Sequence, residues 1–417
     1  MSIRKRISLG LGLLAILVIL SSTYSLSKNP ANSAGLLNNQ APFSAKGPFE
    51  VGIRTQLISA NTPLEIMVWY PGLVNTTDNS NFYSFEIKFQ KPLGRIAIAA
   101  YEGHAFIDVP FDFSMAPYPL VVLSPGFSIS PAAYGWLAEH LASYGFVVIS
   151  PDHAESMDPE NDLWQAVIER PNDILTVFDF VDEQAGTEGY FEGMIDSELV
   201  AVVGHSYGGY TSLAAAGAQI DPAQVKSYCE LAGSDKGEPG VWLCNKLLPH
   251  LADMANTVGL EPDGQELFPS AADPRVDAII PMAGNALFFS QQSFSEITVP
   301  VMAIGGTADQ DSPYLWSTHP TYKYTSSAHK VRIALIDAEH MIFTGPCEKI
   351  PFHLLPFSGE FCSDSIWNRS DAHTLIKHFT TAFLLAEIKN DTTAISALAP
   401  EGIDFNNVDY EAIGYGD

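Results

Sequence analysis

The chain has 417 residues and a formal net charge of −27, from 21 Lys and Arg against 48 Asp and Glu. Hydrophobic residues make up 47% of it and charged residues only 17%, which excludes a disordered or fibrous protein because there is ample apolar surface for a core. A surface this acidic repels phosphate backbones and anionic headgroups, so the composition argues against a nucleic-acid partner and against electrostatic docking to membranes.

The first 26 residues have the pattern of an export signal. Arg4, Lys5 and Arg6 precede an apolar run at residues 7–20, and small polar residues follow. The run is short for a membrane-spanning helix, which needs about 20 apolar residues, but no Ala-x-Ala cleavage site follows it. We therefore expect a secreted or periplasmic protein, with a membrane anchor at residues 7–20 as the alternative and the only membrane contact. Residues 27–46 have the composition of a linker.

The next segment begins with a predicted hairpin and continues as alternating strands and helices. Residues 51–59 and 64–70 alternate apolar with polar side chains around a turn. After Tyr118, short and fully apolar runs occur at residues 120–123, 146–149, 199–203, 278–282, 301–304 and 332–336. Helical spacing separates several of them, at residues 134–143, at 162–183 with an interruption at Pro171, and at 210–218. This alternation predicts an α/β fold with a mainly parallel central sheet and helices on both faces.

Two stretches depart from the alternation. Residues 220–272 lack a strand pattern and hold a helical stretch near 241–258, which indicates an insertion or a possible lid over the sheet. Residues 389–417 are acidic and weakly patterned, which predicts a loosely held C-terminal tail.

Four cysteines form two local pairs in the sequence, Cys229 with Cys244 and Cys347 with Cys362. An even number in an exported chain indicates two disulfides, and these pairs are the simplest of the three connectivities that four cysteines allow. Four reduced, buried thiols are the alternative. Neither pair has the spacing of a zinc knuckle, and we expect no metal site.

A candidate nucleophile lies in Gly204-His205-Ser206-Tyr207-Gly208, between a predicted buried strand and a predicted helix. In that setting a G-x-S-x-G serine stands on a sharp elbow, where glycines permit backbone approaches that a Cβ would block. We therefore expect Ser206 to be a nucleophile, with an ordinary loop serine as the alternative.

A serine hydroxyl needs a base within hydrogen-bond reach and an acid that orients the base. In this architecture both follow later strands, in the order Ser, acid, His. Asp309 follows the strand at 301–304 and His340 follows the strand at 332–336, so both are expected at the carboxyl edge of the sheet. Three other carboxylates near these strand ends are alternatives for the acid: Asp311, Asp337 and Glu339.

Two backbone amides are expected to stabilise the oxyanion that forms on an attacked carbonyl. The amide of Tyr207 follows the nucleophile, and the amide of Phe127 lies in the loop after the strand at 120–123. Pro125 in that loop has no N–H and is excluded.

Three further polar residues are expected to be structural rather than catalytic. His153 follows the strand at 146–149, and Arg170 and Asp173 lie near the helix interruption, where we expect them to form an ion pair.

An ordered series of short motifs runs through most of the chain, at residues 47–52, 68–71, 119–127, 140–146, 151–153, 169–173, 204–209, 273–276, 305–309 and 338–343. In this combination, over about residues 47–388, the chain resembles α/β-hydrolases of the platelet-activating factor acetylhydrolase group and the bacterial proteins termed predicted dienelactone hydrolases. The resemblance implies an α/β-hydrolase domain over these residues. One departure is Ser124-Pro125-Gly126, where relatives commonly have Ser-His-Gly. A second is the nucleophile, because true dienelactone hydrolases use a cysteine.

That resemblance implies a serine carboxylic-ester hydrolase that acts through an acyl-enzyme and needs no cofactor. It assigns the triad to Ser206, Asp309 and His340, and the oxyanion amides to Phe127 and Tyr207. The implied substrates are short-to-medium acyl esters or acetylated phospholipid-like esters, as small molecules or lipids. A lipase, a polyester hydrolase or a peptidase is the alternative within the fold, and a non-catalytic binding protein is the alternative of another class.

Overall fold

The computed structural model describes residues 41–59, 62–75, 80–158, 161–233, 240–262 and 266–416. The predicted signal segment or anchor at residues 1–26 lies outside these ranges, as does most of the predicted linker. Within them, no helix combines the length and the apolar character needed to cross a lipid bilayer.

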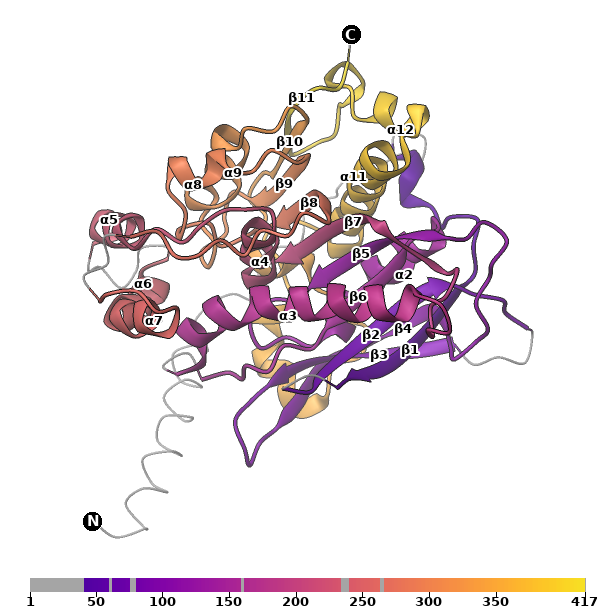
Figure 1. Ribbon diagram of the computed structural model, residues 1–417, viewed down its shortest axis with the longest axis horizontal. Coiled ribbons are helices and arrows are strands. Elements are labelled where there is room, and N and C mark those ends of the chain that lie inside the picture. The colour runs from indigo at the N-terminus through magenta and orange to yellow at the C-terminus, as the bar shows by residue number, and fades with distance from the viewer. Residues whose placement is uncertain are drawn as a thin grey trace. The chain divides into compact units, whose positions relative to one another are not determined.

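The strands of the described residues form one eleven-stranded sheet, in the order β11-β10-β9-β8-β7-β5-β6-β2-β1-β4-β3 (Figure 1). From β6 through β5, β7, β8 and β9 to β10 all neighbours are parallel, whereas the β2–β6, β1–β2, β3–β4 and β10–β11 pairs are antiparallel. The predicted α/β fold with a mainly parallel sheet is therefore confirmed. The strands span β1 (Val51–Ile58), β2 (Leu64–Pro71), β3 (Ser80–Lys88), β4 (Arg95–Ile107), β5 (Tyr118–Ser124), β6 (Val147–Pro151), β7 (Ile195–His205), β8 (Val276–Met282), β9 (Val301–Gly306), β10 (Lys330–Leu335) and β11 (Val408–Ile413).

Helices cover both faces of the sheet. One face carries α2 (Gly135–Ser143), α11 (Arg369–Lys389) and α12 (Thr392–Ala397), and the other carries α3 (Asp162–Ala185), α4 (Tyr207–Ala215), α8 (Gln291–Ser295) and α9 (Thr318–Tyr324). Three helices of the predicted insertion, α5 (Pro222–Ala232), α6 (Val241–Leu247) and α7 (Leu251–Thr257), lie beside one end of α3 (Figure 1). The short α10 (Ser358–Cys362) precedes α11.

Strand β5 explains why the central strands are apolar throughout. Leu120 and Val122 pack into the core beneath α3 and α4, while Val121 and Leu123 pack into the core beneath α2 and α11. All seven residues of β5 are buried, because successive side chains point to opposite faces and both faces are covered.

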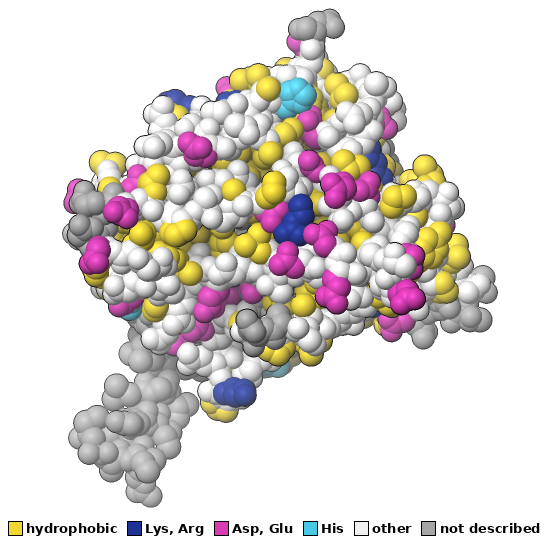
Figure 2. Space-filling model, in the orientation of Figure 1, with side chains coloured by type: hydrophobic (Ala, Val, Ile, Leu, Met, Phe, Trp, Pro, Cys, Tyr) yellow, Lys and Arg dark blue, Asp and Glu magenta, His cyan; other side chains and the backbone are white. Residues whose placement is uncertain are grey.

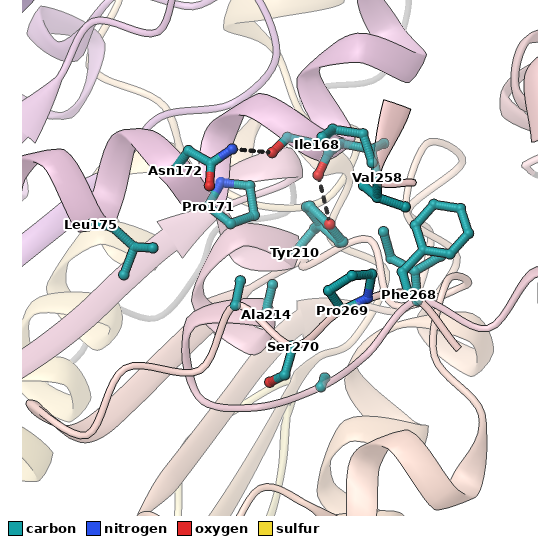
Figure 3. A pocket seen from close by; sticks show the side chains of 14 residues that line it. Ile168, Pro171, Asn172, Leu175, Tyr210, Ala214, Val258, Phe268, Pro269 and Ser270 are labelled. Atoms are coloured by element: carbon teal, nitrogen blue, oxygen red, sulfur yellow. Dashed lines mark hydrogen bonds between the residues drawn. The ribbon is translucent and has the colours of Figure 1, made fainter. Parts of the chain in front are cut away.

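The expected interruption at Pro171 of the predicted helix over residues 162–183 is wrong, because α3 is continuous through this proline. Proline lacks the N–H that would bond to the carbonyl of Val167, four residues earlier. The hydroxyl of Tyr210 on α4 donates to that carbonyl instead, at 2.8 Å (Figure 3). A tertiary contact thus replaces the missing helical hydrogen bond.

The C-terminal segment differs from the predicted loose tail. Residues 408–413 form β11, which pairs in antiparallel register with β10 and so gives the sheet its last strand. Arg332 on β10 bonds Asp409 at 2.9 Å and Glu411 at 3.1 Å, so the acidic residues that suggested disorder are partners of a buried cation. Residues 42–44, expected as linker, form a short 3-10 helix that contacts α11.

Two disulfides close local loops. Cys229 on α5 is bonded to Cys244 on α6, and Cys347 is bonded to Cys362 on α10. The first ties together two helices of the predicted insertion.

Candidate active site

Ser206 stands alone between β7 and α4, in a backbone conformation with φ 57° and ψ −118°. A left-handed φ is unfavourable for a residue with a side chain, and such strain often marks a functional elbow. The flanking glycines make the turn possible. A Cβ on Gly204 would lie 2.1 Å from the carbonyl oxygen of Gly208, and a Cβ on Gly208 would lie 1.9 Å from that of Ser124.

The structure brings Ser206, His340 and Asp309 into one hydrogen-bonded chain. The Oγ of Ser206 lies 2.9 Å from Nε2 of His340, and Nδ1 of His340 lies 2.7 Å from Oδ2 of Asp309. The second carboxylate oxygen of Asp309 accepts from the amides of Asp311 at 2.9 Å and Ser312 at 2.7 Å. These amides fix the carboxylate, so the ring of His340 donates from Nδ1 and accepts the serine proton at Nε2.

The three side chains are buried, with exposed fractions of 8% for Ser206, 7% for His340 and 3% for Asp309. Burial alone lowers the pKa of His340, but the charge and hydrogen bond of Asp309, with a smaller contribution from the charge of Asp311, together outweigh burial and raise this pKa above the ordinary value. Asp309 therefore favours the protonated imidazole that would form when Ser206 gives up its proton.

The amides of Phe127 and Tyr207 are free to bind a ligand. Neither donates a hydrogen bond to any acceptor in the part of the chain that the structure describes. The two rings lie together, with centroids 5.5 Å apart, which places the loop after β5 against the start of α4. The neighbouring amides in the loop are both used: Gly126 N–H donates to Tyr134 at 3.0 Å, and Ser128 N–H donates to Glu155 at 3.2 Å.

Open space lies beside the triad. A hollow of about 330 Å³ adjoins His340 and is lined by polar and acidic residues such as Gln310, Asp311 and Glu339. A second hollow of about 490 Å³ adjoins Asp309 and is lined by apolar residues that include Leu231, Leu315 and Trp316.

A third pocket, of about 160 Å³, lies between α3 and α4 and is lined by residues such as Tyr210, Val258 and Phe268 (Figure 3). It contains none of the three triad residues. Within the described residues, no group of three or more His, Cys, Asp or Glu side chains is arranged to hold a metal ion.

Sequence reasoning missed a second Ser-His-Asp chain. Nδ1 of His153 donates to Asp173 at 2.7 Å, and Nε2 accepts from the hydroxyl of Ser124 at 2.9 Å. Ser124 is fully buried and His153 is 1% exposed, so this serine is sealed from substrate. The sequence signal that could have indicated this second chain is the position of His153, two residues after the buried strand β6.

The expected ion pair between Arg170 and Asp173 is wrong. Arg170 pairs with Glu155 instead, and Asp173 is the partner of His153. One turn of α3 separates the two residues, and they reach different parts of the loop region.

Comparisons with known proteins agree with this architecture. A family model described as PETase, PET hydrolase-like, matches residues 89–234, which include Phe127, Ser206 and Tyr207. Cutinase 2 of Thermobifida cellulosilytica is 33% identical over 104 residues, which are 25% of this chain and 36% of the cutinase. The bis(hydroxyethyl) terephthalate hydrolase of Streptomyces coelicolor is 28% identical over 172 residues, or 41% of this chain and 48% of that enzyme.

The matched stretches thus span less than half of either curated relative. The ferulic acid esterase of Streptomyces cinnamoneus superposes with a TM-score of 0.53 at 19% identity, over 87% of this chain and 96% of that structure. This last likeness concerns the fold. The chain therefore has the α/β-hydrolase fold, its residues 89–234 match the PET hydrolase-like family model, and about a quarter of it is similar in sequence to a cutinase.

Proposed function

We propose that this protein is a serine carboxylic-ester hydrolase of the cutinase type, with Ser206 as nucleophile, His340 as base and Asp309 as acid. The observation that carries the proposal is the hydrogen-bonded chain from Ser206 Oγ through His340 to Asp309, with links of 2.9 and 2.7 Å. Ser206 lies 134 positions from His340 along the chain and Asp309 lies 31 positions from it, yet the three side chains meet just after the carboxyl ends of β7, β9 and β10.

The geometry supports an acyl-enzyme mechanism. As Ser206 Oγ attacks an ester carbonyl, Nε2 of His340 takes its proton, and Asp309 stabilises the resulting imidazolium. The negative charge that develops on the carbonyl oxygen is received by the free amides of Phe127 and Tyr207. The imidazolium then protonates the departing alcohol, and a water activated by neutral His340 releases the acid.

The similarity to cutinases and to a terephthalate diester hydrolase favours a polyester or aryl-ester substrate over an acetylated phospholipid. The surroundings of the site support this choice. Leu231 and Leu315 are 79% and 69% exposed at the hollow beside Asp309, where a long or insoluble ester could lie against apolar surface. A complete hydrogen-bonded chain of serine, histidine and acid also argues against a binding protein without catalytic activity.

We further propose that the protein works outside the cytoplasm. Its two disulfides are stable in an oxidising compartment, which agrees with the export pattern of the N-terminal sequence.

The Ser206→Ala variant tests the catalytic assignment. We expect the rate of p-nitrophenyl ester hydrolysis to fall by several orders of magnitude, to the residual level that binding and the oxyanion amides support, on the order of 10³-fold above water. The control is Ser295→Ala, which removes an exposed serine on α8 and should leave the rate unchanged. Unchanged hydrolysis by the Ser206 variant would contradict the assignment.

A substrate panel separates the candidate classes on the wild-type protein. It compares p-nitrophenyl esters of graded acyl length, bis(hydroxyethyl) terephthalate, an amorphous polyester film and an acetylated phospholipid. Preference for the terephthalate ester and film supports the proposal, whereas preference for the phospholipid restores the acetylhydrolase interpretation. No labelling by a fluorophosphonate probe would favour a binding protein.

A further inference from the structure

Arg170 is a charged side chain that the proposed mechanism does not use, although it is entirely buried. It lies on α3, in the Glu169-Arg170-Pro171 motif, and reaches under the loop that follows β5. Its NH1 donates to the carbonyl of Pro125 at 2.6 Å, and its NH2 donates to the carbonyl of Gly126 at 3.0 Å. One guanidinium thus holds two successive carbonyls of the loop that contains Phe127.

Holding the carbonyl of Gly126 fixes the direction of the next amide. The described cis peptide bonds precede Pro92 and Pro117, so the bond between Gly126 and Phe127 is trans. In a trans peptide the N–H points opposite to the C=O across the same plane. With the Gly126 oxygen directed toward Arg170, the N–H of Phe127 points away from Arg170.

The peptide groups on either side of the Phe127 N–H are also held, whereas the hydroxyl of Ser128 is buried without a partner among the described residues. The amides on either side donate to Tyr134 and Glu155, as described above. The hydroxyl of Ser124 is held by His153. Tyr134 in turn contacts Nδ1 of His205 at 2.8 Å, whose Nε2 lies 3.1 Å from the carbonyl oxygen of His340. The loop is therefore connected to the residue before Ser206 and, through it, to the backbone of His340.

Glu155 keeps the guanidinium in place. Its carboxylate binds NH2 of Arg170 and also accepts from Ser128 N–H. Burial raises the pKa of Glu155, but the charges of Arg170, Lys88 and His153 and the hydrogen bond from Arg170 together outweigh burial and hold this pKa well below its ordinary value. The carboxylate is therefore ionised at neutral pH, and the pair is neutral overall.

Arg170 also contacts the other predicted oxyanion residue. Its guanidinium carbon lies 5.8 Å from the centroid of the Tyr207 ring. A cation that bonds a peptide carbonyl polarises that peptide, which strengthens the hydrogen bond that its N–H can donate.

We propose that Arg170, held by Glu155, is the positioning residue that aims the Phe127 amide at the developing oxyanion. The proposal rests on the proposed esterase function and adds to it a residue that touches no substrate. Arg170 acts through the Gly126–Phe127 peptide, and its effect belongs to the transition state, where the oxyanion exists, rather than to substrate binding.

The test compares Arg170→Lys and Arg170→Met with the wild-type protein on p-nitrophenyl butyrate. Lysine keeps the charge but cannot bond two carbonyls and Glu155 in one plane. We expect kcat to fall by roughly 10²-fold for methionine, the range seen when one oxyanion donor is lost, and by less for lysine. KM should stay unchanged, and the affinity for a phenylboronic acid, which forms a tetrahedral anion on the serine, should fall in parallel with kcat.

Arg170→Met leaves the buried Glu155 without its ion-pair partner and could for that reason fail to fold. A second variant keeps the proposal testable in that case. Glu155→Leu with Arg170→Met removes both charges, an exchange that proteins often tolerate. Its kcat should fall as far as that of Arg170→Met, with the acid limb of the pH profile unmoved because His340 keeps its partners.

The matched control is Arg275→Met, which removes a cation that bonds Asp179 and Asp182 on the same helix but does not contact the loop. It should lower the melting temperature and leave kcat unchanged. The proposal is overturned if Arg170→Lys and the double variant keep the wild-type kcat, or if they raise KM without lowering boronate affinity. Failure of the esterase assignment is a separate result, since it would appear as activity in Ser206→Ala.

Discussion

The conformation of Ser206 is maintained by backbone contacts rather than by its own preference. Its N–H donates to the carbonyl of Met282 at 3.0 Å, and its carbonyl accepts from Asn285 at 3.2 Å. Strain of this kind costs on the order of 1–3 kcal/mol and persists only when the surroundings determine it. The elbow was predictable from Gly204 and Gly208, whereas the contacts with β8 and the loop after it were not, because they join segments about 80 positions apart.

Asp309 sets both the tautomer and the pKa of His340, and Asp309→Asn tests both effects. The base must be neutral to accept a proton, so activity rises with pH through the pKa of His340, which Asp309 raises above the ordinary value of 6.5. We expect kcat to fall by roughly 10⁴-fold in the variant, because the amide no longer holds the active tautomer.

The acid limb of kcat/KM against pH provides the second measurement. The Asp309→Asn variant loses the charge that raises the pKa, so this limb should move to lower pH. An Asp311→Asn variant is the control, since Asp311 contributes its backbone N–H to Asp309 and a smaller charge effect to His340. If the acid limb moves as far in the Asp311→Asn variant, the assignment of Asp309 as the triad acid is wrong.

At the scale of elements, the central strands were predictable and the edges were not. The runs at 120–123 and 199–203 are apolar at every position because helices cover both faces, and this pattern needs no knowledge of distant partners. Strand β3 was missed although Tyr83, Phe85 and Ile87 alternate inward, since polar neighbours give a weaker signal. Similarly, Arg170 was predicted to pair with Asp173, which is close to it along the helix. The sequence does not show that folding brings Glu155, from the segment before α3, into contact with Arg170.

Strand β11 illustrates an edge that stabilises the site from a distance. It covers β10, whose carboxyl end leads to His340, and its Tyr410 ring stacks on Phe379 of α11 with centroids 5.5 Å apart. Truncation after residue 403 would leave β10 as an open edge and Arg332 without its two carboxylates.

We expect this truncation to lower the melting temperature by several degrees and to reduce kcat through His340. A 1 kcal/mol loss corresponds to roughly 2–4 °C in a domain of 150–250 residues. The control is the paired substitution Asp409→Asn with Glu411→Gln, which keeps the strand and removes its charges. If truncation leaves melting and activity unchanged, residues 404–417 contribute nothing to the fold.

At the scale of the whole molecule, the net charge of −27 opposes compaction. Asp and Glu side chains are spread over the face shown in Figure 2, with few Lys and Arg between them. The mutual repulsion of neighbouring carboxylates is visible in individual pKa values. Burial, and then the charges of Asp196 and Glu198, raise the pKa of Asp277. Burial, and then the charges of Asp173, Glu155 and Asp162, raise that of Glu169.

Salt should therefore stabilise the folded chain. Raising NaCl from about 10 mM to about 1 M shortens the Debye length from roughly 30 Å to 3 Å, which screens repulsion between exposed carboxylates more than it weakens buried pairs such as Arg170 with Glu155. We expect the melting temperature at pH 7 to rise over this range and the rise to shrink at pH 4, where carboxylates gain protons. Tetramethylammonium chloride at equal ionic strength is the control for specific Na⁺ binding. A melting temperature that falls steadily with either salt would show that attraction between surface charges, rather than repulsion, dominates this acidic surface.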